Sequence, residues 1–227
     1  YRSAPRNSPL RENALRDRPF YELLHDLRTG NIPQVTWIVP PSYLSEHPDW
    51  LPAAGEHHTN LILSALWSNQ SLWARTAFIL HYDENDGLFD HVSPPTPESG
   101  TAGEFVAGAP VGLGFRVPCL IISPFSRGGY VCSETFDHTS TLRLIEARWG
   151  IEVANLSTWR RATCGDLTAA FGFGESPRLD LPDVPETRAA VARAEKEAMT
   201  LPPPVPTTAG MLPSQELGVR PRRGRDI

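Results

Sequence analysis

Lysine is almost absent from this chain, and long apolar runs are absent altogether. Of its 227 residues, 21 are Lys or Arg and 26 are Asp or Glu, and Lys196 is the only lysine. The formal net charge of -5, with no basic stripe before the arginine cluster at residues 220–225, gives no reason to expect a nucleic-acid partner. No stretch of about 18 or more apolar residues occurs, so the sequence predicts no transmembrane segment.

Cysteine is also scarce, with three residues in the chain, so at least one thiol is unpaired. Cys119 lies in an apolar run and is expected to be a small buried hydrophobic residue. Cys132 and Cys164 are compatible with a disulfide in an exported protein, but the sequence does not fix the distance between them.

An initiator methionine and a signal-peptide pattern are missing at Tyr1. From this we expect the chain to be the interior of a longer protein. Its length and its 40% hydrophobic content suffice for one sizeable core. The composition changes after Gly174, where a segment rich in Ala, Arg and Glu lies between proline-rich stretches. We therefore expect a compact part over residues 1–174 and a Pro/Arg-rich extension, partly helical or disordered, over residues 175–227.

Helices and buried strands are expected to alternate along the compact part. Apolar residues at helical spacing predict helices over residues 17–30, 57–69 and 137–150. Short apolar runs predict strands over residues 32–39, 77–80 and 117–123. Continuous apolar runs are typical of strands buried on both faces of a parallel sheet, which indicates an α/β fold with a mostly parallel sheet. The stretches 1–15 and 93–114 are expected to be irregular surface chain.

A cluster of acids follows the predicted strand at residues 77–80. It contains His91 and four carboxylates, which belong to Asp83, Glu84, Asp86 and Asp90. In open α/β sheets ligands bind at the carboxyl ends of the strands, and clustered carboxylates repel one another unless a positive charge lies between them. A divalent cation would neutralise the cluster and polarise a phosphoryl oxygen. A solvated acidic loop that turns at Gly87 is the alternative, with about equal weight.

Three further residues are candidates because of where they fall. His47 lies in a loop after the predicted strand 32–39, and His138 lies at the positive end of a predicted helix. Arg127 precedes two glycines and could present a cation and free N–H groups to an anion. For His47 an ordinary surface histidine, and for Arg127 an ordinary turn, are the alternatives. His57 and His58 point about 100° apart on a helix, so we expect at least one of them to be exposed rather than both to bind one metal.

Five ordered motifs, taken together, resemble the bacterial phosphoesterase family of phosphatidylcholine-type phospholipases C and acid phosphatases. They are PQVTWIV at residues 33–39, SEHP at 45–48, YDENDGLFDHV at 82–92, VPCLIISPFSRGG at 117–129 and FDHTS at 136–140. The resemblance extends over roughly residues 7–171. Because the five motifs occur in order and with compatible spacing, a chance match is very improbable.

The resemblance implies an alkaline-phosphatase-like α/β/α sandwich in which a hydroxyl nucleophile attacks phosphorus and forms a phospho-enzyme intermediate. It implies that Asp83 and Glu84 contribute ligands to one divalent metal ion, with Ca²⁺, Mg²⁺, Mn²⁺ and Zn²⁺ all compatible. His47 resembles the histidine placed near the phosphate, where it could stabilise charge or protonate the leaving alcohol. His91 and His138 match recurrent family motifs and are expected to have a supporting catalytic role.

The function implied is that of a phospholipase C, which hydrolyses phosphatidylcholine-like lipids at a membrane surface to diacylglycerol and a phosphorylated head group. The alternatives are an acid phosphatase acting on monoesters and an inactive remnant without enzymatic function. The chain has neither the Glu-Asn metal ligands nor the Ser or Thr nucleophile of the family's N-terminal half. We therefore expect it to be a C-terminal portion that is inactive without this missing N-terminal half as its partner. Family members are exported, which implies a secreted or cell-envelope location.

Overall fold

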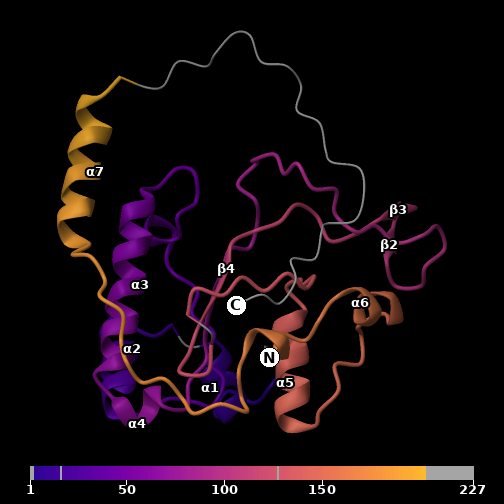
Figure 1. Cartoon of the computed structure of the whole chain (residues 1–227), viewed down its shortest axis with the longest axis horizontal. Coiled ribbons are helices and arrows are strands. Elements are labelled where there is room, and N and C mark those ends of the chain that lie inside the picture. Colours follow the sequence, from indigo (N-terminus) through magenta and orange to yellow (C-terminus); the bar gives the residue numbers. More distant parts are fainter. Residues whose placement is uncertain (1–2, 16, 127, 203–227) are drawn as a thin grey trace. The chain divides into compact units, whose positions relative to one another are not determined.

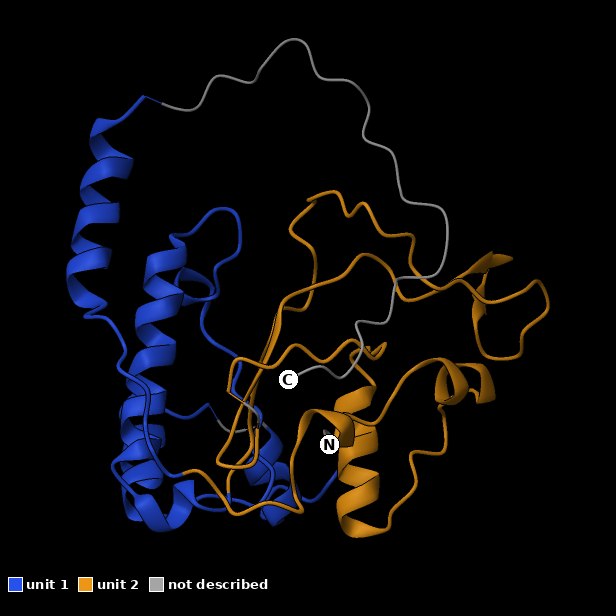
Figure 2. Cartoon of the chain, in the orientation of Figure 1, with its two compact units in different colours: residues 1–75, 179–203 blue, residues 76–178, 204–227 orange. Residues whose placement is uncertain are grey.

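The computed structural model describes residues 3–15, 17–126 and 128–202 of the chain. The chain divides into two compact units, shown in blue and orange in Figure 2. Of the described residues, unit 1 contains those up to residue 75 and residues 179–202, and unit 2 contains residues 76–126 and 128–178. Within this described part unit 1 is therefore discontinuous in sequence, and unit 2 is inserted into it. The predicted boundary at residue 174 stays a prediction.

The regular elements among the described residues of unit 1 are all helices (Figure 1). Its elements are α1 (Pro9–Leu15), α2 (Phe20–Thr29), the short 3-10 helix η1 (Ser42–Leu44), α3 (Pro52–Trp67), α4 (Gln70–Trp73) and α7 (Arg188–Thr200). Gly30 ends α2 in the left-handed conformation, with φ 77°, as the sequence predicted. Helix α1, however, lies in a stretch that we expected to be irregular, and residues 32–39 form no strand. Prolines at positions 33, 40 and 41 lack the N–H groups that a strand would need there.

The core of unit 1 lies along α3 and α4. Leu66 and Ala65 are each 1% exposed, and the rings of Trp67 and Trp73 meet edge to face at 6.2 Å. Asn69 connects these helices to α2, because its side chain caps Leu72 N at 3.0 Å and donates to Arg28 O at 3.0 Å. Burying this apolar surface contributes the main stabilisation of the helices, since short helices are marginal in isolation.

The extension after residue 174, which was expected to be partly helical or disordered, contains α7, and this helix packs on α3. Thr187, which is 4% exposed, contacts His57 Nδ1 at 2.7 Å and accepts a hydrogen bond from Asn60 Nδ2 at 3.1 Å. His57 is thus half-buried, and its neighbour His58 is buried at 7% exposure against the Phe20 ring. The expectation that one of the two histidines is exposed was wrong, because α2 and α7 pack on two sides of α3.

Unit 1 is expected to lose stability as the pH falls from about 7 toward 5. Burial, reinforced by the charge of His57, lowers the pKa of His58 below 6.5. A histidine with a lowered folded-state pKa contributes stability that is complete above its unfolded pKa and decreases as the pH falls below it. Thermal unfolding measured by circular dichroism between pH 7.5 and 5 checks this. His58→Phe should flatten the profile, and an unchanged profile in this variant would contradict the assignment.

Unit 2 contains the strands and three further helical segments. Its elements are β1 (Phe78–His81), β2 (Phe105–Val106), β3 (Ala109–Pro110), β4 (Cys119–Ile122), α5 (Ser140–Trp149), α6 (Thr158–Thr163) and the 3-10 helix η2 (Thr168–Ala170). Gly150 ends α5 with φ 65°, as predicted. The β2–β3 hairpin lies in the stretch 93–114, where no regular structure was expected.

The sheets of unit 2 correct the predicted strand direction. Among the described residues both sheets have two strands, and both pairs are antiparallel. In the main pair Phe78 lies opposite Ile122 and His81 opposite Cys119. The apolar runs located β1 and β4 correctly, but such a run does not determine the direction of pairing. The described fold is therefore mixed α/β with small antiparallel sheets.

A cluster around η2 forms the core of unit 2. It consists of Leu167, Ala170 and Phe171, and Ile79, Ile121 and Leu144 are among the residues that pack against it. The sheet is only partly covered, so Cys119 is exposed rather than buried as expected. Cys119, Cys132 and Cys164 are all free thiols. No helix among the described residues is long and apolar enough to cross a membrane.

Candidate functional site

The acidic pair Asp83 and Glu84 directly follows β1, and both side chains are exposed. The chain reverses direction just beyond them, where Asp86 and Gly87 have φ angles of 58° and 70°. Asn85 holds this turn, because its Nδ2 donates to Leu88 O at 2.6 Å. The strand and the turn therefore present two adjacent carboxylates to solvent at the carboxyl end of β1.

The structure brings His138 to this acidic turn. Its Nε2 lies 3.0 Å from the backbone oxygen of Asp83, although the two residues are 55 positions apart. The His138 ring also packs against the ring of His81 at a centroid distance of 5.2 Å. His138 is exposed and immediately precedes Thr139, the N-cap of α5, so it lies at the positive end of that helix as predicted. The rings of His138 and His81 thus lie together, with His138 against the backbone of the acidic turn.

His91 lies beside Asp90 rather than at the acidic turn. Its Nδ1 is 3.7 Å from Asp90 Oδ1, and its side chain is 59% exposed. Asp90 itself is buried and accepts hydrogen bonds from Arg116 Nε and Nη2, both at 2.7 Å. These bonds from Arg116 hold the pKa of the Asp90 carboxyl far below its usual range. The pair joins the acidic loop to the segment before β4 and sets the rings of Phe89 and Phe115 edge to face at 6.0 Å.

His47 belongs to unit 1, where it follows η1. Its Nδ1 lies 3.5 Å from Asp49 Oδ2, and its side chain is 55% exposed. The preceding Glu46 has a positive φ of 63° and packs on α3 at Gly55. A Cβ at position 55 would lie 2.2 Å from Glu46 Cγ, so only glycine leaves room for this contact. Gly55 on α3 thereby leaves room for the side chain of Glu46, the residue that directly precedes His47.

The described residues do not form a complete metal site. They contain no group of three or more His, Cys, Asp and Glu side chains arranged to hold an ion. Asp83 and Glu84 are only two carboxylates, whereas Ca²⁺ takes six to eight oxygen ligands and structural Zn²⁺ takes four ligands. Arg127, the predicted anion-binding residue, lies outside the described residues.

The sequence-based prediction missed the residues that support the candidate site. His81 is the last residue of β1, one position beyond the predicted strand 77–80, and was not named as a site residue. Arg160, described below, lies on α6, where no motif marked it. Thr139 is the N-cap of α5 and makes no side-chain cap bond, whereas Asp137, two residues earlier, accepts from Thr139 N and Ser140 N through its Oδ1.

Comparison with known sequences identifies the protein family to which the chain belongs. A sequence model of the Phosphoesterase family matches residues 1–152, which is more than half of the chain. The chain belongs to the Phosphoesterase family.

Three similar relatives are named phospholipases C. The chain is 44% identical to the hemolytic phospholipase C of Pseudomonas aeruginosa, over 97% of its own length and 33% of the relative. It is 43% identical to the non-hemolytic phospholipase C of Burkholderia pseudomallei, over 98% of its own length and 35% of the relative. For phospholipase C B of Mycobacterium tuberculosis the identity is 47%, over 72% of this chain and 34% of the relative. The chain therefore spans about a third of the length of these relatives.

Proposed function

We propose that this chain forms part of a phospholipase C that hydrolyses phosphatidylcholine-like phospholipids to diacylglycerol and a phosphorylated head group. The observation that carries the proposal is the contact between His138 and the acidic turn, 3.0 Å from Nε2 to Asp83 O, in a chain whose relatives are named phospholipases C. The contact joins two of the family motifs at one edge of unit 2. Carboxylates and imidazoles are the groups that phosphoryl transfer uses for charge stabilisation and proton transfer.

The roles of the histidines follow from their surroundings. His138 lies at a helix N-terminus, where a developing negative charge on a phosphoryl oxygen is favoured. The His47 side chain lies beside Asp49 and is exposed, so substrate can reach its ring. Its proposed role is to protonate the leaving alcohol. His91 supports the site from its contact with Asp90. We propose that Arg127 binds the phosphate, on the basis of its sequence setting alone.

Asp83 and Glu84 are proposed to contribute to a divalent-metal site only together with ligands from outside this chain. Two adjacent exposed carboxylates are a suitable part of such a site but not the whole of it. We likewise propose that the nucleophile and the remainder of an alkaline-phosphatase-like sandwich come from sequence that the longer relatives include. On this view the chain alone is inactive, and its parent protein acts at a membrane surface after export to the cell envelope or the medium.

The exposed apolar residues near the acidic loop suit a lipid substrate. Leu88 is 70% exposed, and Phe89 and Phe115, whose rings meet edge to face, are 44% and 39% exposed. The Asp90–Arg116 ion pair holds these rings in place at the surface. Aromatic rings fixed at a surface are suited to an interface where one side is apolar and the other is wet.

Hydrolysis of phosphatidylcholine vesicles and of a chromogenic phosphate monoester tests the proposal. Both substrates should be offered to the 227-residue chain alone and to the longest protein that its gene encodes. We expect the longer protein to release diacylglycerol and phosphocholine with little turnover of the monoester, and the chain alone to be inactive. Preference for the monoester would instead identify an acid phosphatase. Folded protein that is inactive on both substrates would identify a non-enzymatic remnant.

A further inference from the structure

Arg160 on α6 lies between two buried carboxylates of unit 2. Its Nε donates to Glu104 Oε1 at 3.0 Å, its Nη2 donates to Glu104 Oε2 at 2.6 Å, and its Nη1 donates to Asp137 Oδ2 at 2.5 Å. The side chains are 14% exposed for Arg160, 3% for Glu104 and 8% for Asp137. Three charged groups are therefore withdrawn from water and depend on one another.

The cation is needed for the two acids to lie so close together. The hydrogen bond from Arg160 lowers the pKa of Glu104, whereas the charge of Asp137 opposes this effect. Burial alone would raise the pKa of Asp137, but hydrogen bonds from Thr139 and Arg160 outweigh it and lower the pKa. The planar guanidinium binds Glu104 through two of its nitrogens and Asp137 through the third, a geometry that the single nitrogen of a lysine does not reproduce.

Asp137 connects Arg160 to the backbone around the adjacent His138. While its Oδ2 binds Arg160, its Oδ1 accepts from Thr139 N at 2.9 Å, Thr139 Oγ1 at 2.7 Å and Ser140 N at 3.1 Å. His138 therefore lies inside a turn whose two flanking residues are hydrogen-bonded to each other. Its own carbonyl oxygen accepts from Thr141 Oγ1 at 2.8 Å. The backbone of His138 has little freedom as long as Asp137 is held.

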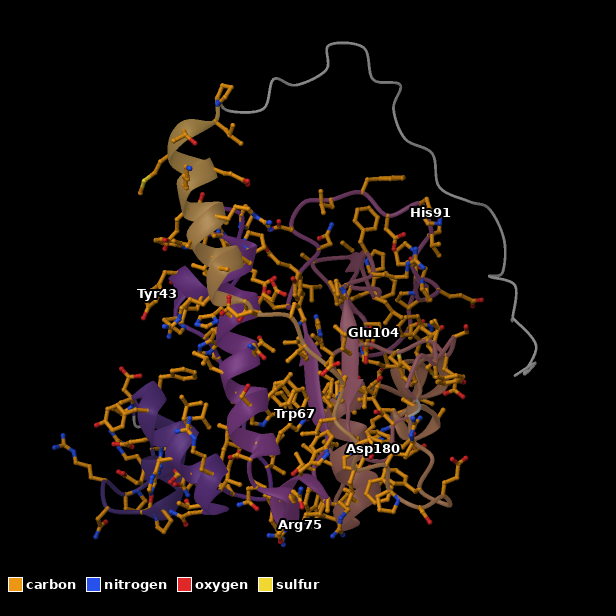
Figure 3. The ribbon with its side chains drawn as sticks, turned by 60° about the vertical axis from the view of Figure 1, so that its left-hand side comes forward. Tyr43, Trp67, Arg75, His91, Glu104 and Asp180 are labelled. Carbon is orange, nitrogen blue, oxygen red and sulfur yellow. The ribbon has the colours of Figure 1, made fainter. Side chains whose placement is uncertain are left out.

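Glu104 connects Arg160 to the loop of residues 93–114. It precedes β2, its carbonyl oxygen accepts from Val111 N at 2.8 Å, and Arg160 Nη2 also donates to Gly112 O at 3.3 Å. Ser157, the N-cap of α6, donates to Glu104 Oε1 at 2.6 Å. Glu104, labelled in Figure 3, is among the largest fully buried side chains. Arg160 thus joins the hairpin loop to the turn before α5.

We propose that Arg160 is a positioning residue for the candidate site, holding His138 against the acidic turn through Asp137 and anchoring the hairpin loop through Glu104. This inference deepens the proposed phospholipase function and rests on it for its catalytic consequence. Arg160 also lies beyond residue 152, where the match to the family model ends. A residue outside the matched segment would therefore control the geometry of a motif within it.

The chain contains a matched control in the adjacent residue. Arg161 lies on the same helix and also makes a bidentate ion pair, with both of its nitrogen–oxygen distances to Glu146 at 2.8 Å. Its Nη2 donates to Val153 O at 2.9 Å, and none of the hydrogen bonds described for Arg161 involves Asp137. Comparing Arg160→Met with Arg161→Met therefore separates the loss of this network from the general loss of an ion-paired arginine on α6.

The first measurement is hydrogen–deuterium exchange on the 227-residue chain, which requires no activity. In Arg160→Met, we expect exchange of the amides of residues 134–142 and 104–113 to accelerate at least tenfold more than that of the β1 and β4 amides, which report the stability of unit 2 as a whole. Arg161→Met should leave both segments unchanged. Unchanged exchange at residues 134–142 in Arg160→Met would overturn the proposal, whether or not the proposed enzymatic function holds. If Arg160→Met does not fold, Arg160→Lys and Asp137→Asn are measured in its place.

The second measurement is phosphatidylcholine hydrolysis by the longest protein that the gene encodes. Arg160→Met should lower kcat about 100-fold, the order of loss that a displacement of about 1 Å produces, with KM changed less than threefold. Arg160→Lys should recover part of this loss, and Arg161→Met should stay within threefold of the parent protein. An equal loss in both methionine variants would overturn the positioning role. Faster exchange in Arg160→Met together with an inactive parent protein would refute the phospholipase function and leave the structural role of Arg160 intact.

Discussion

Replacing Glu104 with alanine is expected to destabilise unit 2 by about 3 kcal/mol, the low end of the range for breaking a buried ion pair. The variant would leave the Arg160 guanidinium with one carboxylate, Asp137, at a site where the arginine side chain is 14% exposed. It would also remove the acceptor for Ser157 Oγ. Burying a charge without its partners is costly, and this cost, rather than the net strength of the pair, determines the expected loss.

Urea unfolding measures this loss, with amide exchange in β1 and β4 as the report on unit 2, because the two units can unfold separately. Glu98→Ala is the matched control, since Glu98 is an exposed acid in the same loop and should change stability by no more than about 0.5 kcal/mol. Glu104→Gln keeps the shape of the side chain and should give an intermediate loss. Equal stabilities of the Glu104→Ala and Glu98→Ala proteins would contradict the assigned role of Glu104.

Replacing His47 with alanine is expected to lower kcat for phosphatidylcholine by about 10²–10⁴-fold, the usual contribution of a general acid. The expectation rests on the proposed function and applies to the longest protein that the gene encodes. His47 is exposed and its contacts are local, so removing it should leave folding intact. Circular dichroism and thermal unfolding of the variant establish this point independently of activity.

His25→Ala provides the matched control for His47→Ala. His25 is also an exposed histidine of unit 1, and Thr29 contacts its backbone oxygen rather than its ring. Its replacement should leave kcat within threefold of the parent value. A His47→Ala protein that keeps more than a third of the parent kcat would show that another group protonates the leaving alcohol.

The sequence was sufficient to predict the elements whose ends carry strong local signals. Gly30 and Gly150 end helices α2 and α5 because a left-handed residue is easiest for glycine, which needs no tertiary information. The apolar runs located β1 and β4, and the acidic motif was correctly placed at the end of β1. Membership of the Phosphoesterase family was also predicted correctly from five short motifs.

Long-range pairing was not predictable from the same signals. The antiparallel register of β1 and β4 depends on which strands are available to pair, and an apolar run is the same in either direction. The contact of His138 with Asp83 and the position of Arg160 between Glu104 and Asp137 join residues 55, 56 and 23 positions apart. In the sequence, a polar residue that is hydrogen-bonded to distant partners looks the same as one that is exposed to solvent.

The insertion of unit 2 into unit 1 has a consequence for synthesis on the ribosome. The contact between His57 and Thr187 joins residues 130 positions apart. At the usual elongation rate of about 5–20 residues per second, α3 emerges roughly 6–26 s before the segment that carries Thr187 is made. During this interval the α7-facing side of α3 is uncovered while residues 76–178 of unit 2 are translated. Completion of unit 1 is therefore a late step of folding, since α7 reaches α3 only after this inserted segment has been made.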